Sequence, residues 1–228
     1  MPYELVIFDN DGVLVDSERI AHRVLAEYLT ELGYPMTLEE SLQHFLGTAA
    51  RNVHTVIADR HGGRLPDDFT ARWQERVYAA FRQSLTATPG AADLLTDLRR
   101  SGVPYCLASS SDRAWIDLAL DLTGLRSHFR PETVFSAEDV GGVGKPAPDL
   151  FLRAAASLGV APRNCLVVED SPNGVLAARA AGMDVLGYTA LTPSERLRTA
   201  GATHLIAHLS EVTGHQGVAI EEDPSPVH

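Results

Sequence analysis

Two aspartates near the amino terminus, Asp9 and Asp11, are the first residues whose type and spacing suggest chemistry. They follow the apolar run 3–8, which has the length and β-forming composition of a strand. If the strand continues, the two carboxylates share a face and repel each other unless a cation or a shared proton compensates. Gly12 then permits backbone conformations that other residues avoid. The pattern predicts a ligand site at a strand end, although Asp and Gly are also ordinary turn residues.

Lys145 is the only lysine among the 19 basic residues of the chain, the others being arginines. A single lysine is usually a solvated surface residue, but this one lies in a loop framed by Gly and Pro before a predicted helix, where binding residues are common. Ser109 ends the apolar run 103–108 and could bind a ligand or cap the next helix, a role for which Ser111 is better placed.

Glu169 and Asp170 directly follow the apolar run 165–168. Two adjacent carboxylates at that place could cap a helix or bind a hard cation. Because the carboxyl ends of parallel strands lie along one edge of a sheet, these side chains could converge with those of Asp9 and Asp11. Because several strand ends carry polar residues of this kind, one shared functional site is favoured over separate structural roles for each residue.

The composition limits the partners that the chain can have. The 228 residues are 45% hydrophobic, enough for a sizeable core, and 19 basic against 30 acidic residues give a formal charge of −11. This charge disfavours nucleic acid and anionic membranes as partners, but not a small anionic substrate held beside a metal. Cys106 and Cys165 are expected to be buried, reduced thiols. No signal peptide or membrane span is predicted, so the cytoplasm is the expected compartment.

Segment 17–87 is predicted to be helical throughout. Ser17 is expected to cap a helix that ends at Gly33, and Thr37 begins a capping-box pattern that opens the second helix, which extends to about Phe45. The two remaining helices are expected at 49–61 and 67–85.

From Thr88 onward, helices alternate with short apolar runs. This alternation predicts an α/β fold with a doubly wound, mainly parallel sheet and helices on both faces. The expected domains are a discontinuous core, 1–16 and 88–228, and an inserted helical cap, 17–87, placed to cover the first motif and exclude water from it. Residues from about Gly214 are expected to form a mobile tail. The expected strands are 3–8, 103–108, 132–135, 165–168, 185–188 and 203–206.

Four motifs, in order, make the chain resemble the haloacid dehalogenase superfamily. They are FDNDGVLVDSE, LASSS, GKPAPD and VVEDSPNG. Within the superfamily, the chain is similar to the β-phosphoglucomutase-like phosphatases and phosphomutases, whose helical C1-type cap follows the first motif. The resemblance extends over nearly all of residues 1 to about 206.

The resemblance implies a mechanism and a ligand set. Asp9 would be a nucleophile that forms an aspartyl phosphate, and Asp11 would protonate the leaving oxygen and later deprotonate the hydrolytic water. The implied cofactor is Mg²⁺, and the implied partner is a small phosphorylated metabolite, with sugar phosphates foremost. The implied metal ligands are Asp9, the Asp11 backbone carbonyl, Asp170 and Glu169 (direct or through water), and the implied phosphoryl-binding residues are Ser109, Ser110 and Lys145.

Other reactions of the superfamily fit less well. Dehalogenases need no Mg²⁺ and typically lack the second aspartate, so Asp11 and Asp170 argue against that activity. Phosphonatases form a Schiff base with a cap lysine, and segment 17–87 contains no lysine. A catalytically silent homologue that only binds a partner is a remote alternative, because loss of Asp9 or Asp11 would be its mark. The leading expectation is a Mg²⁺-dependent phosphatase.

A phosphomutase is the main alternative, since β-phosphoglucomutases resemble the chain throughout. They carry a cap histidine at the position of Ala21, and His22 lies about 100° further round the helix and cannot simply replace it. Those enzymes also carry a Lys and an Arg in a cap loop, around a glycine that matches Gly47. This chain has neither residue type at the matching positions. We therefore expect hydrolysis, with Gly47 and Arg51 as substrate contacts from the cap. The sequence leaves the substrate and the choice between monomer and homodimer open.

Overall fold

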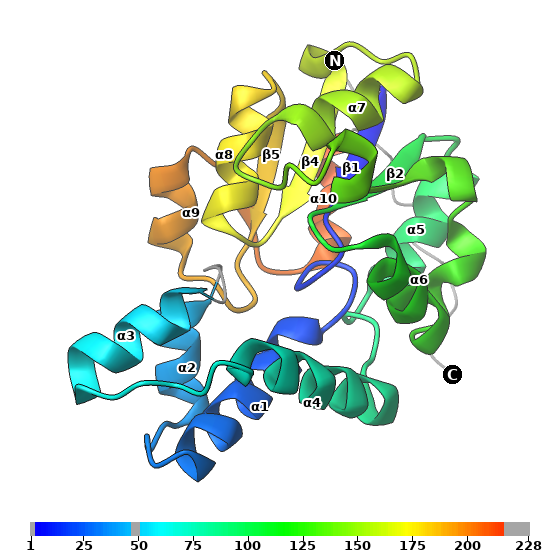
Figure 1. Ribbon diagram of the computed structural model, residues 1–228. Coiled ribbons are helices and arrows are strands. Elements are labelled where there is room, and N and C mark those ends of the chain that lie inside the picture. Colours follow the sequence, from blue (N-terminus) through cyan, green and yellow to red (C-terminus); the bar gives the residue numbers. More distant parts are fainter. Residues whose placement is uncertain (1–2, 47–50, 217–228) are drawn as a thin grey trace, which may run out of the picture.

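A six-stranded sheet forms the centre of the protein (Figure 1). The computed structural model describes residues 3–46 and 51–216, without the side chains of Arg51 and Asn52. The strand order is β3-β2-β1-β4-β5-β6, and all neighbouring strands are parallel. The prediction of a doubly wound α/β fold is thereby confirmed. The strands are β1 (Leu5–Phe8), β2 (Tyr105–Ser109), β3 (Val134–Ser136), β4 (Cys165–Glu169), β5 (Asp184–Tyr188) and β6 (His204–Ile206).

The direction in which strands are added changes between β1 and β4. The chain adds β2 and β3 on one side of β1 and then adds β4, β5 and β6 on the other. Connections that diverge in this way leave a crevice at the carboxyl ends of the two central strands. Asp9 follows β1 and donates its backbone N–H to the carbonyl of Val168 in β4, at 3.0 Å, so both strands end at the crevice together.

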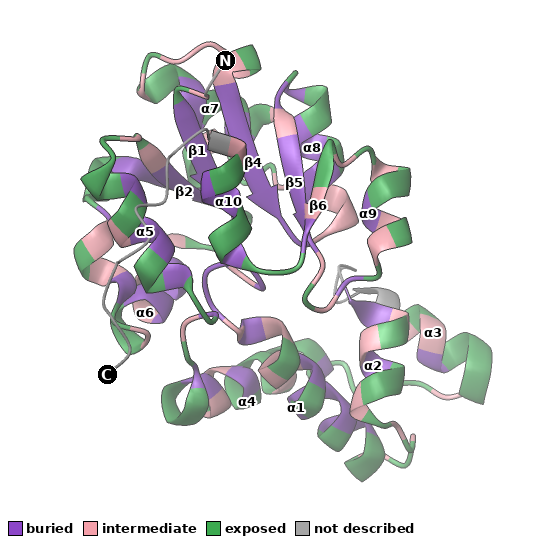
Figure 2. Cartoon of the chain, turned by 180° about the vertical axis from the view of Figure 1, so that it is seen from behind, coloured by how far each residue is buried: buried purple, intermediate pink, exposed green. Residues whose placement is uncertain are grey.

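Strand residues alternate between two apolar clusters, and helices cover both. Val6 and Phe8 belong to the first cluster, and Leu5 and Ile7 belong to the second. Figure 2 shows the buried strands between their covering helices. The first face is covered by α5 (Ala91–Arg100), α6 (Arg113–Leu122) and α10 (Val212–Gln216), and the second by α7 (Asp149–Ser157), α8 (Pro172–Ala180) and α9 (Ser194–Ala200).

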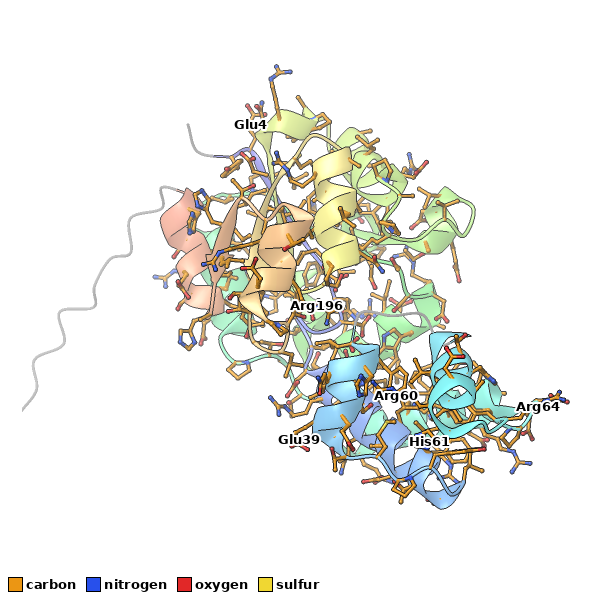
Figure 3. All side chains as sticks on the ribbon, turned by 90° about the vertical axis from the view of Figure 1, so that its left-hand side faces the viewer. Glu4, Glu39, Arg60, His61, Arg64 and Arg196 are labelled. Atoms are coloured by element: carbon orange, nitrogen blue, oxygen red, sulfur yellow. The ribbon has the colours of Figure 1, made fainter. Side chains whose placement is uncertain are left out.

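Four helices form a second group, the helical unit, beyond the carboxyl ends of the strands (Figure 1). They are α1 (Ser17–Glu31), α2 (Leu38–Phe45), α3 (Arg51–His61) and α4 (Phe69–Ser84). The unit has an apolar cluster of its own, in which Tyr28 stacks on Phe69. The predicted capping box of α2 is present, with Thr37 and Glu40 exchanging hydrogen bonds. Arg196 of α9 extends to the helical unit and donates to the carbonyl of Leu46, at 3.2 Å (Figure 3).

Two predicted helix caps are wrong. Ser17 lies inside α1, whose N-cap is Asp16, and α6 is capped by Asp112, whose carboxylate accepts the Trp115 backbone N–H at 2.7 Å. Ser17 and Ser111 instead donate their hydroxyl groups to Asp11. A carboxylate is a stronger acceptor than a neutral partner, which explains why both serines bind it.

The carboxyl-terminal region differs from the prediction in two ways. Helix α9 was not predicted, because it is short and buries only Leu197, which leaves little helical periodicity in the sequence. Gly214 belongs to α10, whereas residues 217–228 of the expected tail lie outside the described residues. Cys106 and Cys165 are buried free thiols, as expected. Within the described ranges, no helix combines the length and apolar character needed to cross a membrane.

Candidate active site

Three buried carboxylates meet where β1 and β4 end. Asp9, Glu169 and Asp170 each offer an oxygen that lies within 4.8 Å of the others, and each residue is no more than 7% exposed. Asp9 and Asp170 come from the loops after the two strands, and Glu169 is the last residue of β4. The predicted convergence of the strand ends is therefore present in the fold. A set of this kind could hold a divalent metal, because hard cations prefer carboxylate oxygens.

Lys145 extends into this carboxylate cluster from the loop before α7. Its ammonium group donates to Asp9 Oδ1 at 2.5 Å, to Glu169 Oε1 at 2.6 Å and to the carbonyl of Ala108 at 3.0 Å. The side chain is only 6% exposed. All three donor hydrogens of the ammonium group thus have acceptors, which holds the cation at a fixed point beside the carboxylates.

The cluster carries more negative charge than Lys145 neutralises. Burial raises the pKa of Asp9 to about 8, against the lowering effect of Lys145 and together with repulsion from Glu169 and Asp11. Burial, and then Glu169 and Asp9, also raise the pKa of Asp170 well above its ordinary value. Burial alone would lower the pKa of Lys145, but the neighbouring carboxylates raise it. A second cation would relieve this excess of charge.

Two glycines, which have no side chains, leave room for these carboxylates. A Cβ at Gly12 would lie 2.1 Å from Asp170 Oδ2, and Gly12 has a φ of +80°. A Cβ at Gly174 would lie 1.8 Å from Glu169 Oε1. Glu169 Oε2 also accepts the backbone N–H and the hydroxyl of Ser171, both at 3.0 Å. The close backbone approach explains why glycine stands at both positions in the motifs.

The carboxylate of Asp11 lies beside the cluster and is bound on both oxygens. Oδ1 accepts the Ser17 hydroxyl at 2.8 Å and the Trp115 indole N–H at 2.9 Å. Oδ2 accepts the Ser111 hydroxyl at 2.9 Å, with Ser109 more distant at 3.4 Å. Ser17, Ser111 and Trp115 were not predicted as partners of Asp11, and the sequence carries no signal for the indole contact.

The two serines predicted to bind phosphate lie at the end of β2. Ser109 is buried and accepts the Ser111 backbone N–H at 3.1 Å. Ser110 is exposed, and its hydroxyl accepts the backbone N–H of Lys145, also at 3.1 Å. Ser110 therefore helps to hold the loop that carries Lys145. Both serines line the cavity described next.

A cavity of about 610 Å³ opens between the sheet edge and the helical unit. The carboxylates, Lys145 and Asp11 line one side, and one face of α4 lines the other. The α4 residues recur at intervals of three and four, so they share a helix face. That face was detectable as a periodic stripe in the sequence but was not interpreted as a binding surface. Its members are Thr70, Trp73, Gln74, Val77, Tyr78 and Phe81.

The neighbouring residues Ala21 and His22 of α1 have different surroundings. Ala21 of α1 lines the cavity. His22 is buried and binds Ser41 of α2 through Nδ1 at 2.9 Å and Glu18 through Nε2 at 3.2 Å. His22 is thus engaged inside the helical unit.

Two cap residues, Gly47 and Arg51, were predicted to contact the substrate. Gly47 and the side chain of Arg51 lie outside the described residues, although the Arg51 backbone begins α3.

Comparisons with known proteins identify the family of the chain. A family model for haloacid dehalogenase-like hydrolases matches residues 3–182. The chain is 34% identical over 219 residues to a protein named probable pseudouridine-5'-phosphatase from Drosophila melanogaster, an alignment that covers 92% of this chain and 91% of the relative. It is also 34% identical over 192 residues to hexitol phosphatase A of Escherichia coli, with 84% and 85% covered.

Solved structures give the same result. A conserved haloacid dehalogenase-like protein from Agrobacterium tumefaciens superposes with a TM-score of 0.86 at 36% identity, covering 93% of this chain and 96% of the other. A Thermotoga maritima protein provisionally assigned to the β-phosphoglucomutases superposes with a TM-score of 0.75 at 26% identity, covering 95% and 100%. The chain belongs to the haloacid dehalogenase-like hydrolase family, whose relatives here include enzymes named as phosphatases.

Proposed function

We propose that the protein is a Mg²⁺-dependent phosphatase of small phosphorylated metabolites, with sugar phosphates as the foremost class. The observation that carries the proposal is a cluster of three buried carboxylates, two of which bind Lys145, that lines a cavity of about 610 Å³ together with Asp11. In this proposal residues 1–16 and 88–228 are the catalytic core, and residues 17–87 are a cap that recognises the leaving group.

The proposed reaction has two steps. In the first, a carboxylate oxygen of Asp9 forms a bond to phosphorus, the bond from phosphorus to the leaving oxygen breaks, and Asp11 gives its proton to that oxygen. In the second, Asp11 takes a proton from water, and the resulting hydroxide displaces Asp9 from the phosphoryl group. Lys145 neutralises charge on the transferring phosphoryl oxygens, aided by the nearby hydroxyl of Ser109.

The carboxylates fit the cofactor that the family implies. Asp9, Asp170 and the backbone carbonyl of Asp11 would hold Mg²⁺, with Glu169 acting through water because Lys145 and Ser171 already bind its two oxygens. When bound, the ion supplies positive charge that stabilises the phosphoryl group in transfer. The raised pKa of Asp9, about 8, would leave this nucleophile largely protonated at neutral pH without a second cation.

Mg²⁺ binding is expected to tighten between pH 6 and pH 8. The pKa of Asp9 is raised from an ordinary acidic value to about 8, so the folded, metal-free protein retains a proton that the unfolded chain has lost. Its stability therefore falls as pH rises through that window, and metal binding must release the proton. The apparent affinity should rise by up to about tenfold per pH unit for each proton released. Thermal unfolding with and without Mg²⁺ at pH 6, 7 and 8 measures it.

The matched control is Asp170→Asn, which should remove the Mg²⁺-induced shift in melting temperature at every pH. A shift of equal size at pH 6 and pH 8 in the wild-type protein would contradict the linkage between metal binding and the carboxylate protons.

The face of α4 supports a substrate with a ring-sized leaving group. It offers apolar and aromatic surface from Trp73, Val77 and Tyr78, with Thr70 and Gln74 as hydrogen-bonding groups. The relatives reported above are named for phosphates of a hexitol and of a nucleoside. A phosphorylated sugar or sugar derivative fits both the mixed character of this face and those names.

The phosphomutase alternative is less well supported by this chain. Ala21 contacts the cavity where mutases carry their cap histidine, and His22 is held by Ser41 and Glu18. A methyl group cannot transfer protons to a sugar hydroxyl. Hydrolysis is accordingly the proposed reaction.

A phosphate-release assay across a metabolite panel tests the proposed function. Hexitol phosphates, hexose phosphates and nucleoside monophosphates are each incubated with the protein in Mg²⁺ or in excess chelator. We expect release that depends on Mg²⁺ and is highest for one sugar-bearing class. The panel includes β-glucose 1-phosphate with a bisphosphate primer, and conversion to glucose 6-phosphate faster than phosphate release would replace hydrolysis by the mutase reaction. No release from any ester in Mg²⁺ would overturn the proposal.

A further inference from the structure

The indole of Trp115 joins Asp11 to the helical unit. Trp115 lies in the first turn of α6, where its backbone N–H is fixed by the capping carboxylate of Asp112. Its indole N–H donates to Asp11 Oδ1 at 2.9 Å, and the residue is only 6% exposed. The contact links residues 104 positions apart in the sequence, one in the loop after β1 and the other in α6.

The same ring packs against α4 of the helical unit. Phe81 stacks on it with ring centroids 4.3 Å apart and an interplanar angle of 25°. Tyr78 lies 5.5 Å away, tilted by 41°. Stacked aromatic rings at these distances attract one another beyond their buried area. Any displacement of α4 from the sheet edge therefore acts directly on the indole that binds Asp11.

The chemistry of the indole distinguishes it from the other partners of Asp11. The hydroxyl groups of Ser17 and Ser111 can rotate and can donate or accept, whereas the indole N–H only donates and its direction is fixed by the ring. Since the ring is held by packing on α4 and by the start of α6, Trp115 sets the orientation of the carboxyl group more strictly than the serines do.

We propose that Trp115 is a positioning residue that orients Asp11 toward the leaving oxygen and links that orientation to the placement of α4 over the cavity. The inference rests on the proposed function, because it assigns Trp115 a part in the step that breaks the bond to the leaving group. A merely structural Trp115, one more side chain of the apolar cluster around β1, would support the fold without favouring any one step.

Two phosphate esters with different leaving groups distinguish a positioning role of Trp115 from a merely structural one. An alkyl phosphate from the panel needs a proton from Asp11 as its leaving oxygen departs, whereas p-nitrophenyl phosphate releases a stable phenolate and needs little help. The quantity compared is kcat/KM, which reports the steps up to formation of the aspartyl phosphate. An error in the orientation of Asp11 lowers kcat/KM for the alkyl ester selectively, and a general loss of structure lowers both.

Trp115→Phe removes the N–H and keeps an aromatic ring against Phe81. We expect kcat/KM for the alkyl phosphate to fall by about 10- to 100-fold, the factor typical of one hydrogen bond to a carboxyl group that becomes charged as its proton leaves. The value for p-nitrophenyl phosphate should stay within about threefold of wild type. Equal losses for the two esters, or no loss for the alkyl ester, would overturn the inference.

Phe81→Leu is the matched variant, since it leaves the indole N–H in place and removes the stacked ring. We expect a smaller loss, about threefold or more, again confined to the alkyl ester. If Trp115→Phe does not fold, as judged by its melting curve, Phe81→Leu provides the test instead. Equal losses of kcat/KM for the two esters in Phe81→Leu would overturn the link to α4. A wild-type protein that hydrolyses neither ester would instead defeat the proposed function, and the inference with it.

Discussion

Asp9→Asn is expected to lower Mg²⁺-dependent phosphate release by about 10⁴-fold or more, the scale seen when a catalytic nucleophile is removed. Asparagine keeps the shape of the side chain but cannot form a stable acyl phosphate. The backbone of Asp9 remains bound to Val168 in β4, and the variant removes a carboxylate from a cluster in which burial already raises the pKa of Asp9 to about 8. The fold should therefore persist. Initial rates and melting curves of the two proteins measure both effects.

The control for this prediction is Asp97→Asn, on the exposed surface of α5, which should retain wild-type rates. The intermediate offers a second readout. Wild-type protein quenched in acid during turnover should carry phosphate on the peptide that contains Asp9, and the variant should carry none there. Release at the wild-type rate by Asp9→Asn, or labelling of a different residue, would show that Asp9 is not the nucleophile.

The positions of the site residues were predictable because a parallel sheet converts sequence order into spatial order. Apolar runs of strand length mark where β1 and β4 end, and the polar residues that follow them must meet at one edge. Asp9 and Glu169 were placed by this rule alone. Lys145 needed a further clue, its place as the only lysine of the chain in a loop before α7. The structure brings its ammonium group between those two carboxylates.

The partners of Asp11 were not predictable in the same way. The serine rule is local: a hydroxyl near a helix start is expected to cap it. Ser17 and Ser111 depart from that rule because a carboxylate distant in sequence accepts their hydrogens. Trp115 is harder still, since an aromatic residue on an amphipathic helix is normally part of the core. Its contact with Asp11 depends on the rotation of α6 against β1, a property of tertiary packing that no short pattern encodes.

The helical unit was predicted as four helices that cover the first motif, but the face of α4 that lines the cavity was not predicted. The helical periodicity of the sequence placed both ends of α4 within two residues of their observed positions. The capping-box pattern placed the start of α2. Which face of α4 meets the sheet edge depends on the two connections between the helical unit and the sheet. These pair with each other through the backbone, Asp16 donating to the carbonyl of Thr86 and Thr88 to that of Leu14. The α4 side of the cavity could therefore be inferred only from the fold.

Lys145→Met is expected to lower both activity and metal-free stability, and the loss of stability should grow with pH. Methionine fills a similar volume but leaves Asp9 and Glu169 without the ammonium group that each binds. Removing one partner of a buried ion pair typically costs about 3–5 kcal/mol, or about 6–20 °C in melting temperature for a chain of this size. The protein can reduce this cost by protonating Asp9, whose pKa then loses the lowering effect of Lys145 and rises further above 8. A proton retained only by the folded state makes stability fall as pH rises, so the deficit should be larger at pH 8 than at pH 6.

Activity should fall by about 10³-fold at saturating Mg²⁺, because the phosphoryl oxygens lose one of their two neutralising charges. Lys145→Arg separates charge from geometry. Its guanidinium keeps a positive charge beside Asp9, so most of the metal-free stability should return. Its planar head cannot reproduce the three acceptor contacts of the ammonium group, so the rate should stay well below wild type. Melting curves in chelator at both pH values, with kcat/KM in Mg²⁺, measure these effects. If Lys145→Met were as stable as wild type in chelator at pH 8, the negative charge of the cluster would have to be neutralised without Lys145, and the account of why this site requires a second cation would be wrong.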